Sequence, residues 1–274
     1  MKKKIIAVLI HLELITASLF VIVPVIWIVM ASFHKGDSLA AATLIPEEFT
    51  LENYVRLFCD TDYPVWFFNT LKIASLNAVL SVILVMVTSW IMSRFQFRGK
   101  KFGLISILIL SMFPSFLSMT AIYTLFLTLG LVGKPISLII VYSAGAIPYN
   151  TWLVKGYLDG IPKEIDEAAY IDGCRKFQSF FKMILPLSKP IITYCAVSQF
   201  MLPWMDYILP NILLSGEKTR TLAVGLFKMI DGKENSYFTT FAAGAVLIAV
   251  PITILFMVFQ KYLVQGVAAG ASKG

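Results

Sequence analysis

The sequence predicts an all-α polytopic membrane protein with six transmembrane helices. Of its 274 residues, 58% are hydrophobic and only 14% are charged, whereas about 25% of the residues of an average soluble domain are charged. The apolar residues also gather in runs of roughly 20 residues or more, the length that a helix needs to cross the hydrocarbon core. Lipid is therefore the expected solvent for most of this chain.

The first expected segment covers residues 10–32. It follows Met1-Lys2-Lys3-Lys4, which resembles the start of a signal peptide. The apolar stretch from Ile5 to Phe33 is too long for a cleaved signal sequence and suits a retained spanning helix. A polar loop is expected over residues 33–68.

Five further apolar segments complete the predicted bundle. Pro114 lies inside the third segment and Pro148 inside the fourth, and both are expected to favour kinks. Membrane helices tolerate such prolines because neighbouring groups satisfy the freed carbonyls. We expect one membrane domain over residues 1–274, with its core at 70–262, a cytoplasmic loop at 156–190 and a tail at 263–274. The five segments are expected at 70–92, 104–129, 134–155, 191–214 and 239–262.

The basic residues indicate the orientation. Six segments place both termini on one side of the membrane, together with the loop at 156–190. Of the 23 basic residues, 15 fall in the pieces 1–9, 93–103, 155–190 and 261–274 that share this side. The positive-inside rule places this side in the cytoplasm. The net charge of +7 therefore follows from topology, and no nucleic-acid partner is expected.

Motifs for enzymatic chemistry are missing from the sequence. The three cysteines, Cys59, Cys174 and Cys195, have no spacing typical of a metal site or disulfide framework. There is no GxxxxGK[ST] phosphate loop and no HExxH motif, so the chain is not expected to bind ATP, a metal or another cofactor itself. A membrane enzyme is an alternative function, but the sequence contains no recognisable set of catalytic residues to support it.

The loop at 156–190 contains a predicted short polar helix. Pro162 is expected in its first turn, where proline is tolerated. Glu164, Asp166 and Glu167 place negative charge near the helix N-terminus, where the helix dipole favours it. Gly173 is the expected end of the helix.

One side of this helix is small and suited to close contact. Helical spacing brings together Ile165, Ala168, Ala169 and Asp172, and the adjacent alanines leave a shallow surface that another protein can approach. The alternative is an amphipathic helix lying on the membrane surface. The small, acidic character of this side disfavours that alternative, since membrane-surface helices are rich in Lys, Trp and Phe.

The loop resembles the cytoplasmic signature of ABC-importer permeases. That signature reads Glu-Ala-Ala, three residues, Gly, nine residues, Ile, one residue, Leu-Pro. Glu167-Ala168-Ala169, Gly173 and Leu185-Pro186 stand in register, and Met183 replaces the usual isoleucine. The resemblance implies a type I ABC importer permease fold. It also implies that the loop forms a coupling helix that docks in a cleft of a separate ATP-hydrolysing subunit, which uses ATP and Mg.

The resemblance further implies roles for individual residues. Glu167 is expected to make the charged contact with the ATPase, while Ala168, Ala169 and Gly173 allow close packing. The ATPase-coupling residues expected from this signature and its helix are Glu164, Glu167, Ala168, Ala169, Asp172, Gly173, Leu185 and Pro186.

Other stretches resemble the carbohydrate branch of this family. They are Phe49–Tyr54, Trp66–Leu71, Trp204–Tyr207 and the Gly/Ala-rich tail ending in Ser272-Lys273-Gly274. The tail is similar to that of the smaller permease subunit of maltose/maltodextrin importers. This resemblance implies import of sugars in the plasma (inner) membrane of a prokaryote. The implied partners are a second homologous permease chain, an ATPase homodimer and an extracytoplasmic sugar-binding protein.

Several polar and aromatic residues in the expected segments are candidates for the sugar pathway. An acid at membrane depth is a functional-site hypothesis by default, and Asp206 is such an acid. A buried hydrogen bond between helices is the equally weighted alternative for Asp206. In the maltose family the partner permease makes most sugar contacts. The candidates on this chain are Asn150, Trp204, Asp206, Tyr207 and Asn211.

Two other transport functions remain open at this point. The signature loop alone also fits an ABC permease for amino acids, peptides or phosphate. An ion-coupled secondary transporter working alone usually shows repeated halves and broken helices around an ion site. The sequence shows no clear internal repeat, which favours the ATP-driven importer.

Overall fold

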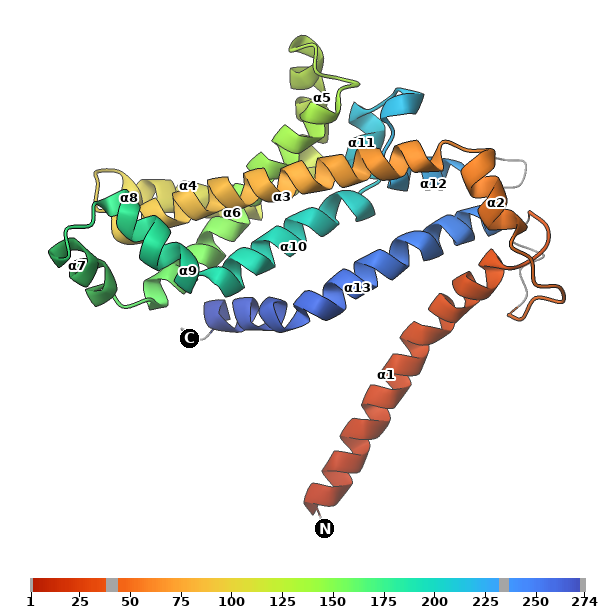
Figure 1. Cartoon of the computed structure of the whole chain (residues 1–274), viewed down its shortest axis with the longest axis horizontal. Coiled ribbons are helices and arrows are strands. Elements are labelled where there is room, and N and C mark those ends of the chain that lie inside the picture. Colours follow the sequence, from red (N-terminus) through yellow and green to blue (C-terminus); the bar gives the residue numbers. More distant parts are fainter. Residues whose placement is uncertain (1, 38–43, 232–236, 272–274) are drawn as a thin grey trace. The chain divides into compact units, whose positions relative to one another are not determined.

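The computed structural model is helical, and it describes residues 2–37, 44–231 and 237–271 (Figure 1). Within these ranges, one isolated antiparallel bridge joins His34 to Phe49 and no strand is present. The chain forms two units. The first comprises Met1–Val65 and Val224–Ile252, and the second comprises Trp66–Ala223 and Thr253–Gly274.

Four helices in the described ranges are long and apolar enough to cross a membrane: α1 (Lys2–Ser32), α3 (Tyr63–Arg94), α6 (Pro135–Gly160) and α13 (Phe238–Ala271). Two bent helix pairs raise the number of spans to six if each pair crosses the membrane once. The structure therefore confirms an all-helical protein with four to six candidate spans.

The expected third segment, 104–129, is broken at its proline. Helix α4 (Lys100–Met112) ends before Pro114, the short helix η2 (Ser115–Ser118) follows, and α5 (Met119–Thr128) leaves at an angle of 90°. Phe113 adopts an extended conformation, which is the conformation that a following proline favours. A sharp break thus replaces the expected kink. Pro148, by contrast, lies inside an uninterrupted α6.

The expected fifth segment, 191–214, is also divided. Helix α10 (Lys189–Met205) ends just before Asp206, whose backbone is extended, and α11 (Ile208–Leu213) begins two residues after Asp206. The expected loop at 156–190 begins late, because α6 continues to Gly160. The sixth segment is longer than expected, since α13 continues to Ala271. Residues 272–274 of the predicted tail lie outside the described residues.

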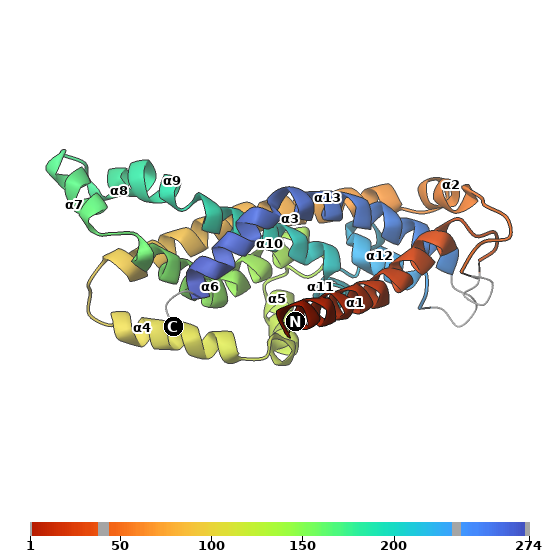
Figure 2. The same ribbon diagram turned by 90° about the horizontal axis from the view of Figure 1, so that it is seen from below.

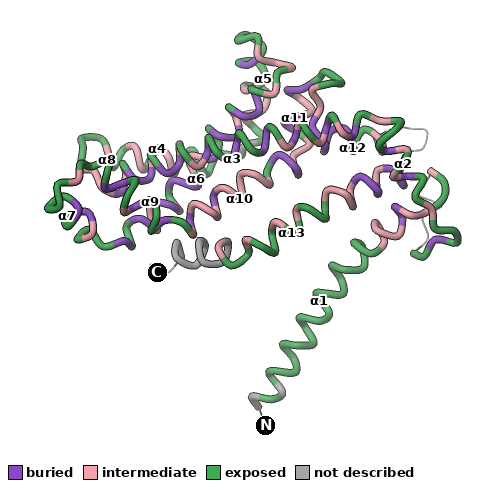
Figure 3. The backbone as a smooth tube through the Cα atoms, in the orientation of Figure 1, coloured by how far each residue is buried: buried purple, intermediate pink, exposed green. Residues whose placement is uncertain are grey.

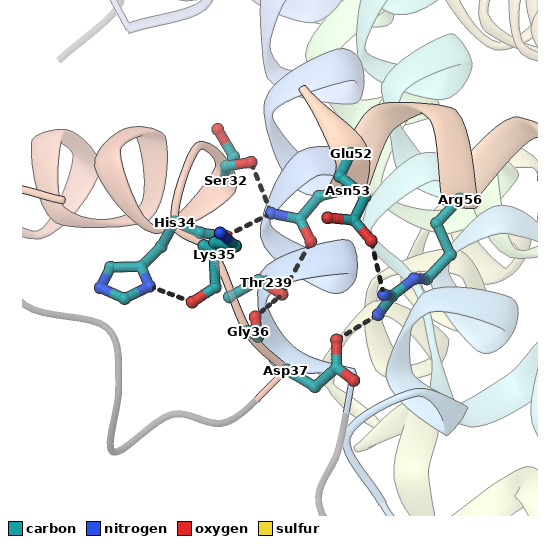
Figure 4. A network of polar contacts seen from close by, with 9 residues as sticks. All are labelled: Ser32, His34, Lys35, Gly36, Asp37, Glu52, Asn53, Arg56 and Thr239. Atoms are coloured by element: carbon teal, nitrogen blue, oxygen red, sulfur yellow. Dashed lines mark hydrogen bonds and ion pairs between the residues drawn. The ribbon is translucent and has the colours of Figure 1, made fainter. Parts of the chain in front are cut away.

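In the first unit, a polar network joins the end of α1 to α2 (Glu52–Cys59) and to the start of α13 (Figure 4). The buried Asn53 amide donates to the carbonyl oxygens of Ser32 and His34, at 3.0 and 2.8 Å. The Thr239 hydroxyl lies 3.0 Å from the Asn53 side-chain oxygen. Arg56 forms an ion pair with Asp37. Because buried polar groups need partners, this network holds residues 32–37 against α2 and the start of α13.

Most of α1 is exposed along its length (Figure 3), and only 6% of its most apolar window is buried inside the chain. Most of its exposed side chains are aliphatic or aromatic, as in Leu12, Phe20 and Val25, and the exposed His11 and Glu13 lie in its N-terminal half. A helix that is apolar on all sides is stable in lipid or against another apolar protein surface. This exposure agrees with the expectation of a retained spanning helix.

In the second unit, α3 is the helix on which several others pack. Its Val85, Met86 and Trp90 join a buried apolar cluster with residues of α6, α10 and the segment between them. Near its middle, the buried Asn77 amide donates to the backbone carbonyl of Gln199 on α10, at 2.7 Å. A second apolar cluster joins α3, α5, α6 and α11. These contacts position two candidate sites, one in the signature loop and one beside α10.

Candidate coupling and translocation sites

The predicted polar helix in the signature loop is α7 (Glu164–Ile171). Pro162 lies just before the helix and not in its first turn, which corrects the sequence prediction. The predicted end at Gly173 is confirmed. Gly173 has φ +81°, its N–H donates to the Tyr170 carbonyl at 3.0 Å, and the Cys174 N–H donates to the Ala169 carbonyl at 2.9 Å. This pair of bonds is a Schellman motif, which glycine favours.

The two sides of α7 differ in how far they are exposed to solvent. Glu164, Glu167 and Ala168 are exposed, and Ile171 is 87% exposed although it is aliphatic. Ala169 is 1% exposed. It therefore packs within its own chain, which corrects the expectation that both alanines face a partner. The helix presents an acidic and apolar outer surface made of Glu164, Glu167, Ala168 and Ile171.

Buried polar contacts hold the inner side of α7. Asp166 forms an ion pair with Arg94 at the end of α3, with 2.8 Å between Oδ2 and Nε. The Ser179 hydroxyl on α8 (Lys176–Ser179) donates to Asp166 Oδ1 at 2.8 Å. Arg94 also donates from Nη2 to the Ile161 carbonyl at 2.9 Å. Asp166 and Arg94 are nearly solvent-free, with side chains 8% and 7% exposed.

An aromatic cluster lies beside these polar contacts. The Trp90 ring is 4.6 Å from the Phe180 ring and 4.9 Å from the Phe95 ring, between centroids. Aromatic pairs at such distances contribute beyond their buried area. Burial raises the pKa of the nearby Tyr170 hydroxyl, and the Asp166 carboxylate adds to this effect. Figure 2 shows α7 and α8 next to each other beyond the body of the second unit.

Leu185 and Pro186, the last residues of the signature, come later in the sequence and do not belong to α7. They begin the short helix α9 (Leu185–Leu187), after the π-helical turn Phe180–Ile184. Leu185 is partly buried against the cluster that contains Trp90, whereas Pro186 is exposed. The Tyr157 hydroxyl donates to the Leu187 carbonyl at 2.9 Å. The chain bends by 78° between this segment and α10.

Asp206 lies at the break between α10 and α11, and it is bonded on both carboxylate oxygens. The Tyr142 hydroxyl on α6 donates to Oδ2 at 2.8 Å. The Leu209 N–H, in the first turn of α11, donates to Oδ1 at 3.3 Å. The hydrogen bond between helices, which was the alternative for this acid, is therefore present in the structure.

A cavity of about 640 Å³ lies between α5, α6, α10 and α11. Its walls are mostly aliphatic, and its polar side chains include Tyr142, Tyr149, Asn150, Gln199 and Asp206. Tyr149 is 62% exposed. Asn150 is buried, and its amide donates to the Ala146 carbonyl at 2.9 Å. Such a mixture of apolar walls and a few polar groups is typical of small-molecule sites.

The cavity brings together only part of the predicted sugar pathway. Asn150 and Asp206 line it, whereas Trp204, Tyr207 and Asn211 do not. Trp204 is buried against Phe67, with 5.3 Å between ring centroids.

Sequence reasoning missed other residues of both sites. Tyr149 adjoins Asn150 in the chain, but no spacing signal singled it out. The pairing of Arg94 with Asp166 joins residues 72 positions apart, as their numbers show. Of the residues missed, only Ile171 gave a signal in the sequence, because it is an aliphatic residue in a polar loop.

Among the described residues, no group of three or more His, Cys, Asp or Glu side chains is placed to hold a metal ion. The charged groups that the structure gathers are instead paired acids and bases, as at Asp166. The two sites are an exposed acidic and apolar helix surface and a mostly apolar cavity with a few polar side chains.

Comparison with known proteins identifies similar transport components. A family model described as "Binding-protein-dependent transport system inner membrane component" matches residues 85–269. The chain is 38% identical to the galactooligosaccharides transport system permease protein GanQ of Bacillus subtilis (strain 168), over 96% of this chain and 94% of the relative. It is 40% identical to the maltodextrin transport system permease protein MdxG of the same organism, over 96% of this chain and 95% of the relative.

The fold is similar to that of a solved transporter. A chain in the crystal structure of a bacterial ABC transporter involved in the import of the acidic polysaccharide alginate matches with a TM-score of 0.83 and 24% identity. The match covers 94% of this chain and 96% of that chain. At this identity the likeness concerns the fold alone, and it extends over nearly the whole helical arrangement.

Proposed function

Because the chain belongs to the family of inner membrane components of binding-protein-dependent transport systems, we propose that it is a permease subunit of an ATP-driven importer of oligosaccharides of the maltodextrin type. The observation that carries this proposal is the similarity, over nearly the full length, to two permeases named for galactooligosaccharides and maltodextrin. The chain itself performs no ATP hydrolysis in this proposal. ATP and Mg are used by a separate ATPase subunit.

The outer surface of α7 supports a coupling role. It combines the acidic groups of Glu164 and Glu167 with the exposed aliphatic side chain of Ile171. An exposed apolar side chain surrounded by charged groups is typical of the centre of a protein interface. We assign this surface to docking in the ATPase cleft, with Glu167 making the charged contact.

The cavity beside α10 supports a place for this chain in the translocation pathway. Tyr149 offers an exposed aromatic ring, and the Gln199 side chain and the Asp206 carboxylate also line the cavity, whereas the buried Asn150 amide is bonded to the Ala146 carbonyl. Sugars bind to aromatic faces and hydrogen-bonding groups of this kind. In the proposed mechanism, ATP binding closes the ATPase dimer, α7 moves with its docking cleft, and the two permease chains rock to change the side to which the pathway opens.

The remaining partners and the location are part of the same proposal. A second homologous permease completes the pathway, two copies of an ATPase drive it, and an extracytoplasmic sugar-binding protein delivers the oligosaccharide. The protein resides in the plasma (inner) membrane of a prokaryote with both termini in the cytoplasm.

Purification of the tagged chain from its native membrane in mild detergent tests the assembly. We expect a second permease, an ATPase and a sugar-binding protein to be recovered with it, and mass spectrometry to identify all three. A chain that is recovered alone, and that still transports in vesicles without any ATPase, contradicts the proposal and supports an ion-coupled secondary transporter.

The substrate class needs a separate measurement on the recovered complex. ATP hydrolysis in proteoliposomes is measured with the co-purified binding protein and with maltodextrins, galactooligosaccharides or amino acids. Stimulation by maltodextrins is the expected result. Stimulation by amino acids alone would retain the importer and reject the oligosaccharide assignment.

A further inference from the structure

From the contacts around α7 we infer that Arg94 is a positioning residue, which links α7 rigidly to the membrane helix α3 through its ion pair with Asp166. This inference rests on the proposed function, because it concerns how α7 transmits force from an ATPase. The residue is absent from the signature motif and lies on a different helix from it.

Asp166 is the point at which three elements meet. Its Oδ2 faces Arg94 on α3 at 2.8 Å, and its Oδ1 accepts from Ser179 on α8 at 2.8 Å. Asp166 itself belongs to α7. The contact with Arg94 is an ion pair without hydrogen-bond geometry, whereas the contact with Ser179 is a hydrogen bond. Because the two contacts come from different helices, a rotation or slide of α7 disturbs at least one buried polar contact, and such contacts are costly to leave unmade.

Arg94 adds a fourth element to the same joint. Its Nη2 donates to the carbonyl of Ile161, which follows the end of α6, at 2.9 Å. Arg94 therefore contacts two elements at once, α7 by an ion pair and the residue after α6 by a hydrogen bond. The adjacent Ser93 hydroxyl donates to Asp159 of α6 at 2.6 Å. The end of α3 therefore fixes both the entry to the signature loop and the helix within it.

Contacts along α3 continue from this joint to the cavity. Asn77, on the same helix, donates to the carbonyl of Gln199 on α10 at 2.7 Å. The Gln199 side chain lines the cavity. An α-helix is a stiff element, so a displacement of α7 that is carried by Arg94 reaches α10 through α3. The outer surface of α7 stays free for docking because every one of these contacts is on its inner side.

The test uses the complete complex in proteoliposomes, with its binding protein and a maltodextrin. Sugar uptake and ATP hydrolysis are measured in the same vesicles, and the ratio of the two is compared among variants. Arg94→Met and Asp166→Asn are each expected to lower this ratio at least threefold. The reversed pair, Arg94→Asp with Asp166→Arg, is expected to recover part of it. Arg98→Met, which changes an exposed arginine four residues further on, is the matched control and is expected to retain the wild-type ratio.

A merely structural role would reduce the amount of complex without changing the ratio. A wild-type ratio in Arg94→Met therefore overturns the inference. Absence of ATP-dependent sugar uptake in the wild-type complex would instead reject the proposed function. If Arg94→Met does not assemble, Arg94→Gln decides, since it keeps a donor for the Ile161 carbonyl but loses the ion pair with Asp166; a wild-type ratio in that variant overturns the inference.

Hydrogen exchange supplies a readout that is independent of the substrate. In the purified complex, the amides of α7 are expected to exchange faster in Asp166→Asn than in wild type, while those in the middle of α3 keep their protection. Equal exchange of α7 in the two proteins would overturn the inference, whatever the complex transports.

Discussion

The signature loop and the α10–α11 break are both polar interruptions between apolar helices, but they use their acids differently. In the loop, Asp166 is buried on the inner side of α7, and Glu164 and Glu167 remain exposed on the outer side. At the break, the single acid Asp206 is engaged by Tyr142 and by the backbone of α11. In the loop, different acids therefore anchor the helix and face a proposed partner. At the break, the same acid both anchors two helices and lines the cavity.

This difference affects how each region responds to substitution. A change on the outer surface of α7 is expected to alter coupling without disturbing the fold. A change at Asp206 is expected to disturb the fold and the pathway together, because one carboxylate serves both. The predictions below separate these cases, beginning with the largest expected effect.

Reversal of the charge of Glu167 is the most severe test of the outer surface. Glu167→Lys is expected to reduce ATP-driven uptake by about tenfold or more, because loss of a partly buried ion pair costs several kcal/mol and about 1.4 kcal/mol corresponds to tenfold. Uptake in vesicles and the yield of assembled complex are measured together. Glu47→Lys, at an exposed acid outside the signature loop, is the control. Wild-type uptake by Glu167→Lys would count heavily against the docking assignment.

Removal of the Tyr142 hydroxyl tests the anchoring role of Asp206. Tyr142→Phe is expected to lower the free energy of unfolding by about 1.5–3 kcal/mol, the usual range for a hydrogen bond to a charged group. Thermal denaturation of the purified complex measures this loss, with Tyr123→Phe on α5 as the control. The double variant with Asp206→Asn should be less destabilised than the sum of the single changes. Full additivity would show that the two side chains do not interact.

The end of α7 provides a local comparison between two glycines. Gly173→Ala is expected to destabilise the loop by roughly 1–2 kcal/mol, because an L-residue is strained at a left-handed φ. Gly156→Ala in α6 is the control; there, alanine is expected to stabilise the helix slightly, since the added carbon meets nothing within 4 Å beyond its chain neighbours and the backbone of its own helix. Hydrogen exchange over residues 164–175 distinguishes the two. Equal protection in both variants would contradict the role of Gly173.

The cavity assignment predicts the smallest effect. Tyr149→Ala is expected to raise the KM for sugar uptake by about fivefold, since an aromatic contact contributes on the order of 1 kcal/mol. Trp204→Phe is expected to leave KM unchanged, because Trp204 is outside the cavity and packs on Phe67. A larger change in KM for Trp204→Phe than for Tyr149→Ala would contradict the assignment and indicate that Trp204, and not Tyr149, contacts the sugar.

Much of the fold was predictable from the sequence, because apolar length and charge position depend on local composition. The four continuous spans and the glycine that ends α7 followed from such local signals. The family resemblance was also correct, as the near-full-length similarity to sugar permeases shows. The sequence predicted a kink at Pro114, where the structure has a full break. Proline alone does not distinguish the two outcomes, because Pro148 lies inside the continuous helix α6 whereas α4 ends before Pro114.

The contacts that orient the sites were not predictable. Helical spacing placed Ala168 and Ala169 on a common side, but only the packing of α7 determines that Ala169 is buried and Ala168 exposed. The partner of Asp166 lies on a distant helix, and so does that of Asp206. Pairings of this kind depend on tertiary structure, which no spacing within one helix specifies.

Photo-crosslinking from the two sides of α7 tests the central claim most directly. A photoreactive amino acid replaces Ile171 on the outer surface or Ala169 on the inner side, and the complex is irradiated in native membranes. We predict that position 171 crosslinks to the ATPase subunit and that position 169 yields only crosslinks within this chain. Crosslinks from position 171 to lipid alone would contradict the account and would place α7 on the membrane surface.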